Sequence, residues 1–199
     1  MLLAAGFAPT FPEKSLPNAD LDGAMMMLEA LLRAHEPYPA LIVDRHWDLI
    51  AANRAVSSLT AGISQDLLRT PANVLRLTLH PNAMAPKIEN LSQWRTYLLE
   101  RLSRQVEQTA DPKLDSLLTE LSAYPVGDPG RPSETERDQI ATPLRLRTDH
   151  GQLSFWSTTT IFDAPKDVTV SELMLETFLP ADQVTREILV AIMDHQASP

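Results

Sequence analysis

The side chains in this chain that can do chemistry are few and scattered. His80 precedes Pro81 and could act as a general base, but the sequence assigns it no serine or aspartate partner. Asp44, His46 and Asp48 alternate around a predicted turn, a spacing that would suit a metal ion if the three side chains converged. One histidine with two aspartates is a weak ligand set, and solvated polar groups are the simpler interpretation. The pattern does not indicate a catalytic site.

The motifs of common enzyme classes are absent from the sequence as well. It contains no G-x-S-x-G, no H-E-x-x-H and no Walker segment, and its six glycines are too scattered for a nucleotide-binding fingerprint. The absence of cysteine excludes disulfides, thiolate metal sites and flavin–thiol adducts. Haem would need an axial ligand, for which His80 is the one candidate. We therefore expect no enzymatic activity and no cofactor, with a small hydrolase or isomerase using His80 as an alternative.

The charge of the chain bears on its partners. It carries 17 basic and 26 acidic residues, a net charge of −9, and its arginines occur singly or in pairs. Such a balance repels a phosphate backbone, so we expect no DNA binding by this chain alone. The apolar start lacks a basic leader and is broken by Pro9 and Pro12, which predicts neither a signal peptide nor a membrane span. Absence of cysteine suits a reducing compartment, and we expect a cytoplasmic protein.

Two short apolar runs near the start predict a β-hairpin. They are Ala40–Val43 and Trp47–Ala52, separated by the polar residues Asp44 to His46. Asn53 follows where a helix would begin, and its short polar side chain can cap that helix. A later apolar run, Asn73–Leu79, is too short for its periodicity to decide between strand and helix.

Longer apolar periodicities predict helices. One runs from Asp20 to His35 and carries three consecutive methionines, Met25–Met27, which widen its apolar face. This face either contacts a second copy or packs against the protein's own sheet, and we expect a homodimer through Leu21–Leu32. Further helices are predicted from Leu91 to about Gln108, from Asp111-Pro112 onward, and after Asp182.

The pattern changes from helical to alternating after a connection rich in proline, glycine and charge, Tyr124–Ala141. Three predicted strands follow, around Leu144–Arg147, Gln152–Phe162 and Glu172–Leu179. Together with the hairpin they make a five-stranded antiparallel sheet covered by helices, which is an α+β fold of PAS-like layout with an N-terminal helical extension.

Four stretches resemble one family, the ligand-binding domains of MmyB-like transcription regulators. They are YPALIVDRHWDLIAANRAV, LHPNAMAPKIENLSQWR, LSFWSTTTIF and the run DVTVSEL…FLPAD, which together span nearly everything from Pro37 to Thr185. In this family a PAS-like domain follows a helix-turn-helix domain of the XRE class. The resemblance therefore implies that residues 37–199 are the ligand-binding domain. It also implies that residues 1–36 are the linker and helix that follow a helix-turn-helix domain absent from this sequence.

The resemblance also implies an apolar, fatty-acid-like ligand that modulates DNA binding by the helix-turn-helix domain. A mostly apolar cavity with a few polar groups is what a small-molecule site requires. We expect the polar head near His80 and the tail between sheet and helices, and the candidate ligand-binding residues are His80, Trp94, Leu98, Trp156, Thr158, Phe178 and Asn53. The alternative is that these side chains fill the core, which would make the chain a structural dimerisation domain without ligand.

Overall fold

The fold is built on one antiparallel sheet of five strands. The computed structural model describes residues 18–60, 63, 67–68, 71–125, 142–162 and 173–197. The strands lie in the order β2-β1-β5-β4-β3. Their bounds are Ala40–Val43 for β1, Leu49–Ala52 for β2, Leu144–Thr148 for β3, Gly151–Ile161 for β4 and Met174–Pro180 for β5. The predicted α+β class and five-stranded antiparallel sheet are confirmed, and the layout is consistent with a PAS-like domain.

The hairpin turn is longer than the sequence predicted. Strand β2 begins at Leu49 rather than Trp47, because Trp47 has a φ of +69° and cannot continue a strand. The Asp44 carboxylate holds this turn by accepting the backbone N–H groups of His46 and Asp48, at 2.8 and 2.9 Å. The turn therefore extends to the buried Trp47, and β2 begins two residues after it.

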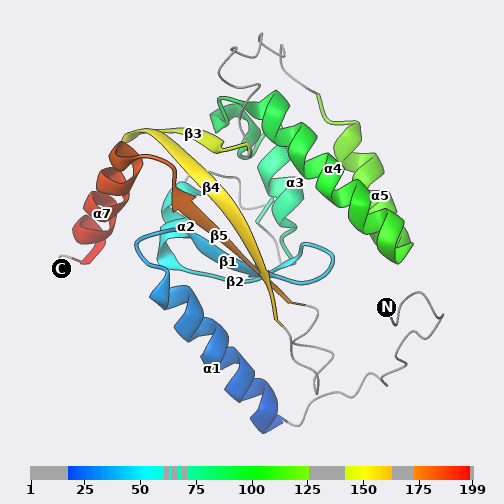
Figure 1. The fold of residues 1–199 in the computed structure, drawn as a ribbon, viewed down its shortest axis with the longest axis horizontal. Helices are drawn as coiled ribbons and strands as arrows, with labels where there is room; N and C mark the ends of the chain where they lie inside the picture. The colour runs from blue at the N-terminus through cyan, green and yellow to red at the C-terminus, as the bar shows by residue number, and fades with distance from the viewer. Residues whose placement is uncertain are drawn as a thin grey trace.

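Helix α1 (Asn18–Ala34) covers one face of the sheet, called here the outer face. It begins two residues before the predicted start at Asp20. Leu28 and Leu32 pack against Ile42 of β1 and Leu175 of β5, and all four side chains are buried. In Figure 1, α1 lies on the side of the sheet opposite α3, α4 and α5.

The remaining helices between the strands lie at the inner face. They are α2 (Arg54–Leu59), α3 (Val74–Leu79), the 3-10 helix η2 (Ala85–Lys87), α4 (Leu91–Thr109) and α5 (Pro112–Ser122). The ambiguous run after Asn73 is thus a helix, and Asn73 caps it by accepting the Arg76 N–H at 3.2 Å. At the predicted start of α5, Asp111 likewise accepts the Lys113 N–H at 2.8 Å and caps the helix.

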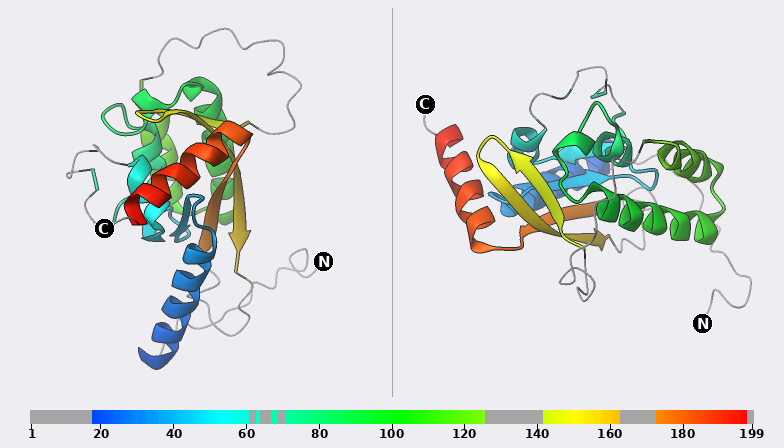
Figure 2. Two further views of the ribbon diagram at one scale, coloured as in Figure 1. Left: turned by 90° about the vertical axis from the view of Figure 1, so that its left-hand side faces the viewer. Right: turned by 90° about the horizontal axis from the view of Figure 1, so that it is seen from above.

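The last helix, α7 (Gln183–Ala197), lies beside the β3–β4 hairpin, at the opposite end of the molecule from α5 (Figure 2). Asp182 caps it by accepting the Thr185 N–H at 2.7 Å. The buried Thr185 hydroxyl in turn accepts the Ser154 N–H at 2.9 Å, which ties the helix to β4.

None of the described helices is long and apolar enough to cross a membrane. The predictions for the apolar start of the chain and for most of the connection Tyr124–Ala141 lie outside the described residues.

Candidate functional site

A cavity of about 190 Å³ lies between the inner face of the sheet and helices α2, α3 and η2. Strands β1, β2, β3, β4 and β5 all contribute to its floor, and its walls are almost entirely apolar. The lining residues are Pro39, Leu41, Leu49, Ala52, Val56, Ser57, Leu59, Thr60, Leu68, Val74, Leu77, Thr78, Met84, Ile88, Leu144, Leu146, Phe155 and Phe178. Such a site can hold an apolar molecule through contact area rather than through charge.

Three hydroxyl groups are the polar part of this lining. Those of Thr60 and Thr78 donate to helix carbonyls, Val56 O at 3.1 Å and Val74 O at 2.8 Å. Ser57 is exposed, so its hydroxyl lies at the mouth of the cavity, where water is available. The polarity therefore favours a ligand whose apolar body enters the cavity and whose polar end stays near Ser57.

Helix α3 forms one wall of the cavity and is anchored from behind by an ion pair. The Arg76 guanidinium donates two hydrogen bonds of 2.7 Å to the two carboxylate oxygens of Glu120 on α5. The Tyr124 hydroxyl donates a third, of 2.6 Å, to Glu120 Oε1. Arg76, helped by Tyr124, lowers the pKa of Glu120 to about 2, while burial and the bond to Glu120 raise the pKa of Tyr124 to about 12.

Of the seven predicted ligand-binding residues, Phe178 lines the cavity. Its ring meets Phe155 edge-on, with 6.3 Å between the ring centroids. Trp94 and Leu98 project from α4 into the same hydrophobic core, where they are 3% and 6% exposed, but they do not line the cavity. The sequence therefore placed these two in the correct layer, and the structure places them beside the site rather than in it.

His80 and Asn53 hold the fold together at other places. His80 ends α3, its Nδ1 accepts the Asn82 N–H at 3.1 Å, and its ring meets Tyr124 edge-on at 5.3 Å. The prediction that Asn53 caps α2 is wrong, because its side chain makes no cap hydrogen bond. The amide is used elsewhere: it accepts the Ala40 N–H at 3.2 Å and donates to the carbonyls of Leu32 and Tyr38 at 3.2 and 2.8 Å.

Trp156 and Thr158 lie on the outer face of the sheet. Side chains alternate along a strand, so residues 156 and 158 of β4 point away from the face that carries Phe155. Trp156 is 36% exposed, and the Thr158 hydroxyl is 2.6 Å from that of Thr177 on β5. Neither residue lines the cavity.

The possible metal ligands of the hairpin turn do not converge. Asp44 binds backbone N–H groups, the His46 ring nitrogen Nε2 lies 2.9 Å from Asp111, and Asp48 accepts a hydrogen bond from Asn73. Within the described ranges, no three histidine or carboxylate side chains are grouped to hold a metal ion.

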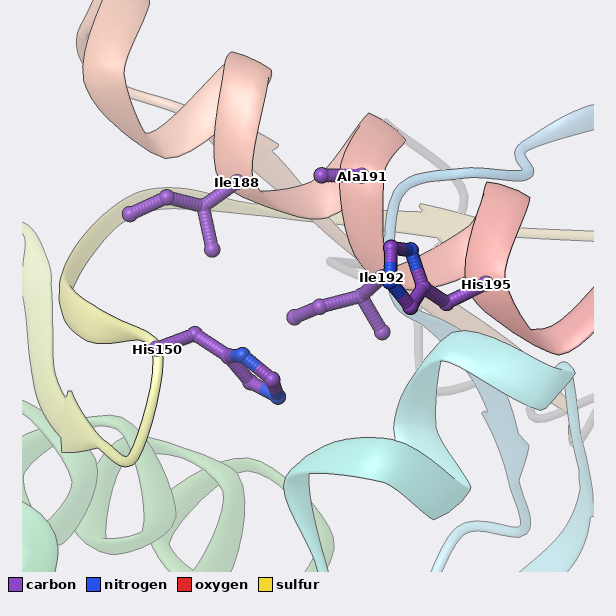
Figure 3. A pocket seen from close by; sticks show the side chains of 5 residues that line it. All are labelled: His150, Ile188, Ala191, Ile192 and His195. Atoms are coloured by element: carbon purple, nitrogen blue, oxygen red, sulfur yellow. The ribbon is translucent and has the colours of Figure 1, made fainter.

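A second cleft, of about 340 Å³, lies between the β3–β4 turn and α7. Figure 3 shows the His150 ring directed toward Ile188 and Ile192, with His195 one turn further along the helix. His150 and His195 are both exposed, so this cleft is part of the surface. The cavity under the sheet is lined by residues from all five strands and from α2 and α3, whereas this cleft is lined by His150 and four residues of α7, so the cavity is the stronger candidate.

Sequence reasoning missed the contribution of α2 and α3 to the site. Val56, Leu59 and Thr60 recur at helical spacing and face the cavity, as do Val74 and Leu77. That spacing was the available signal, but in helices of six residues it does not say which neighbour the apolar side meets.

The sheet order, the covering helices and an apolar cavity between them define a small-molecule-binding domain of PAS-like layout. The family model of the MmyB-like transcription regulator ligand binding domain matches residues 25–191, and the chain belongs to this family. No curated protein sequence matches the chain.

Proposed function

We propose that this chain is the ligand-sensing domain of a transcription regulator and that its cavity binds an apolar, fatty-acid-like molecule. The family supports a ligand-binding role in transcription regulation. The choice of ligand class rests on one observation, the apolar cavity under the sheet with three hydroxyl groups in its lining. A tail in contact with Phe178, Leu77 and Met84 would leave the polar head near Ser57.

The volume of the cavity limits the length of the chain that it can hold. Its volume of about 190 Å³ exceeds the roughly 150 Å³ of an engineered apolar cavity that binds benzene. It is below the roughly 300–1,000 Å³ typical of sites for drug-sized ligands. A short chain therefore fits as it stands, while a long chain requires movement of the lining or exposure of its end at the mouth.

In this proposal the ligand modulates DNA binding by a helix-turn-helix domain of the same regulator, in the cytoplasm, and the chain has no catalytic role. The net charge of −9 supports leaving DNA contacts to another domain. A homodimer through α1 completes the proposal, because Met26 and Met27 are 71% and 44% exposed on this helix. Exposed methionines suit adaptable protein contacts.

The test is a series of saturated fatty acids added to the purified chain, with thermal stability as the readout. A ligand at a hundredfold excess over Kd stabilises the folded state by about 2.7 kcal/mol. Each further buried methylene contributes about 0.8 kcal/mol, or roughly fourfold in affinity, until the cavity is full. We expect the affinity to rise with chain length and then to fall.

Two variants test whether the optimum chain length is set by binding in the cavity. Phe178→Ala enlarges it and should shift the optimum to longer chains. Trp156→Ala removes a similar area from the opposite face of the same sheet and should leave the optimum unchanged. A melting temperature that stays flat across the whole series would refute the fatty-acid proposal and favour a structural domain without ligand.

A further inference from the structure

Among the described residues, strand β4 has neighbouring strands on both sides over only part of its length. Strand β3 pairs with residues 151–155 of β4, whereas β5 pairs with residues 155–161. From Trp156 to Ile161, no described strand lies on the side of β4 away from β5. In Figure 1, β3 runs beside only the upper part of β4, and the lower part continues without it.

The backbone groups on this open side can be assigned. In an antiparallel strand, the N–H and C=O of one residue point to the same neighbour, and the direction alternates along the strand. Ala181 N–H donates to Ser154 O at 2.8 Å, so Ser154 and every second residue after it turn toward β5. Phe178, opposite Ser157, donates its N–H to Pro39 instead, which agrees with this alternation. The residues whose backbone groups face the open side are therefore Ser157, Thr159 and Ile161.

The open edge lacks the features that block edge pairing. Natural proteins protect exposed edges with lysine, proline, inward charges or bulges. The segment Trp156–Ile161 reads Trp-Ser-Thr-Thr-Thr-Ile, which has no charge, proline or glycine and consists largely of residues that favour strands. Ile161 is 68% exposed. The strand itself carries no charge, and the cation beside it, Arg101, which donates to the Thr159 hydroxyl at 2.6 Å, is neutralised by Glu176.

We propose that this edge pairs with the same edge of a second copy, antiparallel, about a two-fold axis at Thr159. The three outward-facing residues are arranged symmetrically about Thr159, as an interface between identical surfaces requires. Thr159 lies opposite the partner's Thr159, and Ser157 lies opposite the partner's Ile161. Each of the three resulting pairs exchanges two backbone hydrogen bonds.

This register also brings the outer-face side chains together. Thr158 lies opposite the partner's Thr160, and Trp156 lies opposite the partner's Phe162, an aromatic cross-strand pair. Phe162 already packs in the cluster that contains Met25 of α1, so the edge and the methionine-rich helix belong to one continuous surface. The inference thus rests on the homodimer of the proposed function and adds the β4 edge to the α1 surface through which that dimer forms.

A proline at the axis tests the pairing. Thr159→Pro removes an N–H that faces the open side, while the hydrogen bonds between β4 and β5 need no donor at this position. We expect the wild-type chain to sediment as a dimer and Thr159→Pro to raise the dimer dissociation constant at least tenfold. Thr159→Ala keeps the N–H and loses the hydroxyl, so it should remain a dimer and controls for the side chain.

Single cysteines test the register even if the proline variant does not fold. The chain has no cysteine of its own. Cα atoms of a hydrogen-bonded antiparallel pair lie about 5.5 Å apart, within the range that a disulfide spans. Thr159→Cys should therefore give a cross-linked dimer under mild oxidation. Thr158→Cys is the matched control, because two copies of residue 158 are diagonal neighbours at roughly 7–8 Å and should cross-link much less.

The outcomes separate this inference from the proposed function. A wild-type monomer at high concentration overturns both the paired edge and the homodimer and says nothing against ligand binding, which the fatty-acid series measures. A dimer that survives Thr159→Pro and dissociates with Met26→Glu overturns the paired edge alone. Equal cross-linking of Thr158→Cys and Thr159→Cys overturns the register.

Discussion

The two ends of the sheet's inner face are built in opposite ways, although Glu176 and Phe178, the β5 residues that face them, are only two positions apart. Phe178 faces the apolar cavity under α2 and α3. Glu176 faces a cluster of polar side chains under α4 and is 3% exposed. One end of the core is hollow and uncharged, whereas the other end is filled and contains a buried ion pair.

Several hydrogen bonds join the side chains of the polar end. Arg101 Nη2 donates to Glu176 Oε1 at 2.6 Å and to the Thr159 hydroxyl at 2.6 Å. That hydroxyl donates in turn to Glu176 Oε1 at 2.8 Å. The Arg101 guanidinium carbon also lies 4.4 Å from the centre of the Trp47 ring, in a cation–π contact.

This contrast explains why one end suits a ligand and the other does not. A ligand in the polar end would have to break charge-assisted hydrogen bonds within a region of low dielectric. A ligand in the apolar end replaces empty volume and gains dispersion contacts that the lining lacks. The Arg101–Glu176 ion pair of the polar end therefore holds α4 on the sheet, whereas the apolar end has room for a ligand.

The largest effect should come from breaking the polar end. Arg101→Met leaves the Glu176 carboxylate buried without its charged partner, and breaking a buried pair in this way costs about 3–5 kcal/mol. We expect a loss of about 3 kcal/mol in the free energy of unfolding, measured by urea denaturation, because Arg101 keeps 19% of its side chain exposed.

The double variant Arg101→Met, Glu176→Leu is the control for this prediction. It removes both charges and should recover most of the lost stability. If Arg101→Met alone unfolds no more easily than the wild type, the ion pair does not hold this end of the core.

A second prediction fills the hollow end. Val56→Phe adds volume to a half-buried residue of the cavity wall. It should abolish the ligand-induced stabilisation, about 2.7 kcal/mol at a hundredfold excess over Kd, and change the stability of the free protein by less than that.

Leu179→Phe is the matched variant for the filled cavity. Leu179 is 39% exposed on the outer face, so the same new side chain there should leave ligand binding intact. Calorimetric melting with and without ligand measures both. Unchanged ligand stabilisation in Val56→Phe would place the ligand somewhere other than this cavity.

Sequence reasoning succeeded where the period of a pattern decides the structure. The hairpin and the three later strand patterns, around Leu144–Arg147, Gln152–Phe162 and Glu172–Leu179, were together enough to predict five strands and the class of fold. The same alternation could have excluded Trp156, since residues 155 and 156 of one strand cannot face the same side. It could not say which of the two faces carries the cavity, because that depends on where α1 and α3 pack.

The polar residues were harder to interpret for a different reason. Asn53 stands at the position of a helix cap, but its amide binds three backbone groups from residues up to 21 positions away. Glu176 looked like one polar member of an alternating strand, and its partner Arg101 is 75 residues away in the sequence. Local sequence patterns do not contain such distant pairings, so only the folded chain reveals them.

The smallest predicted effect concerns the Arg76–Glu120 ion pair behind α3, the helix that forms one wall of the cavity. Arg76 holds the pKa of Glu120 at about 2, below the ordinary value of 4.5 in the unfolded chain. The contribution of this ion pair to the free energy of unfolding is therefore fully present above about pH 4.5 and is lost as the pH falls toward 2. Glu120→Gln should remove this acid-side dependence and cost less than about 1 kcal/mol at pH 7, because both side chains of the pair are about 40% exposed.

Urea unfolding midpoints measured between pH 2 and pH 7 provide the test. The difference between wild type and Glu120→Gln should shrink steadily below pH 4.5. Glu107→Gln, at an exposed residue of α4, should show the acid dependence of the wild type. A difference between wild type and Glu120→Gln that is constant with pH would mean that the carboxylate charge does not hold α3. Apolar packing alone would then hold α3 at the cavity, whereas an ion pair holds α4 at the polar end.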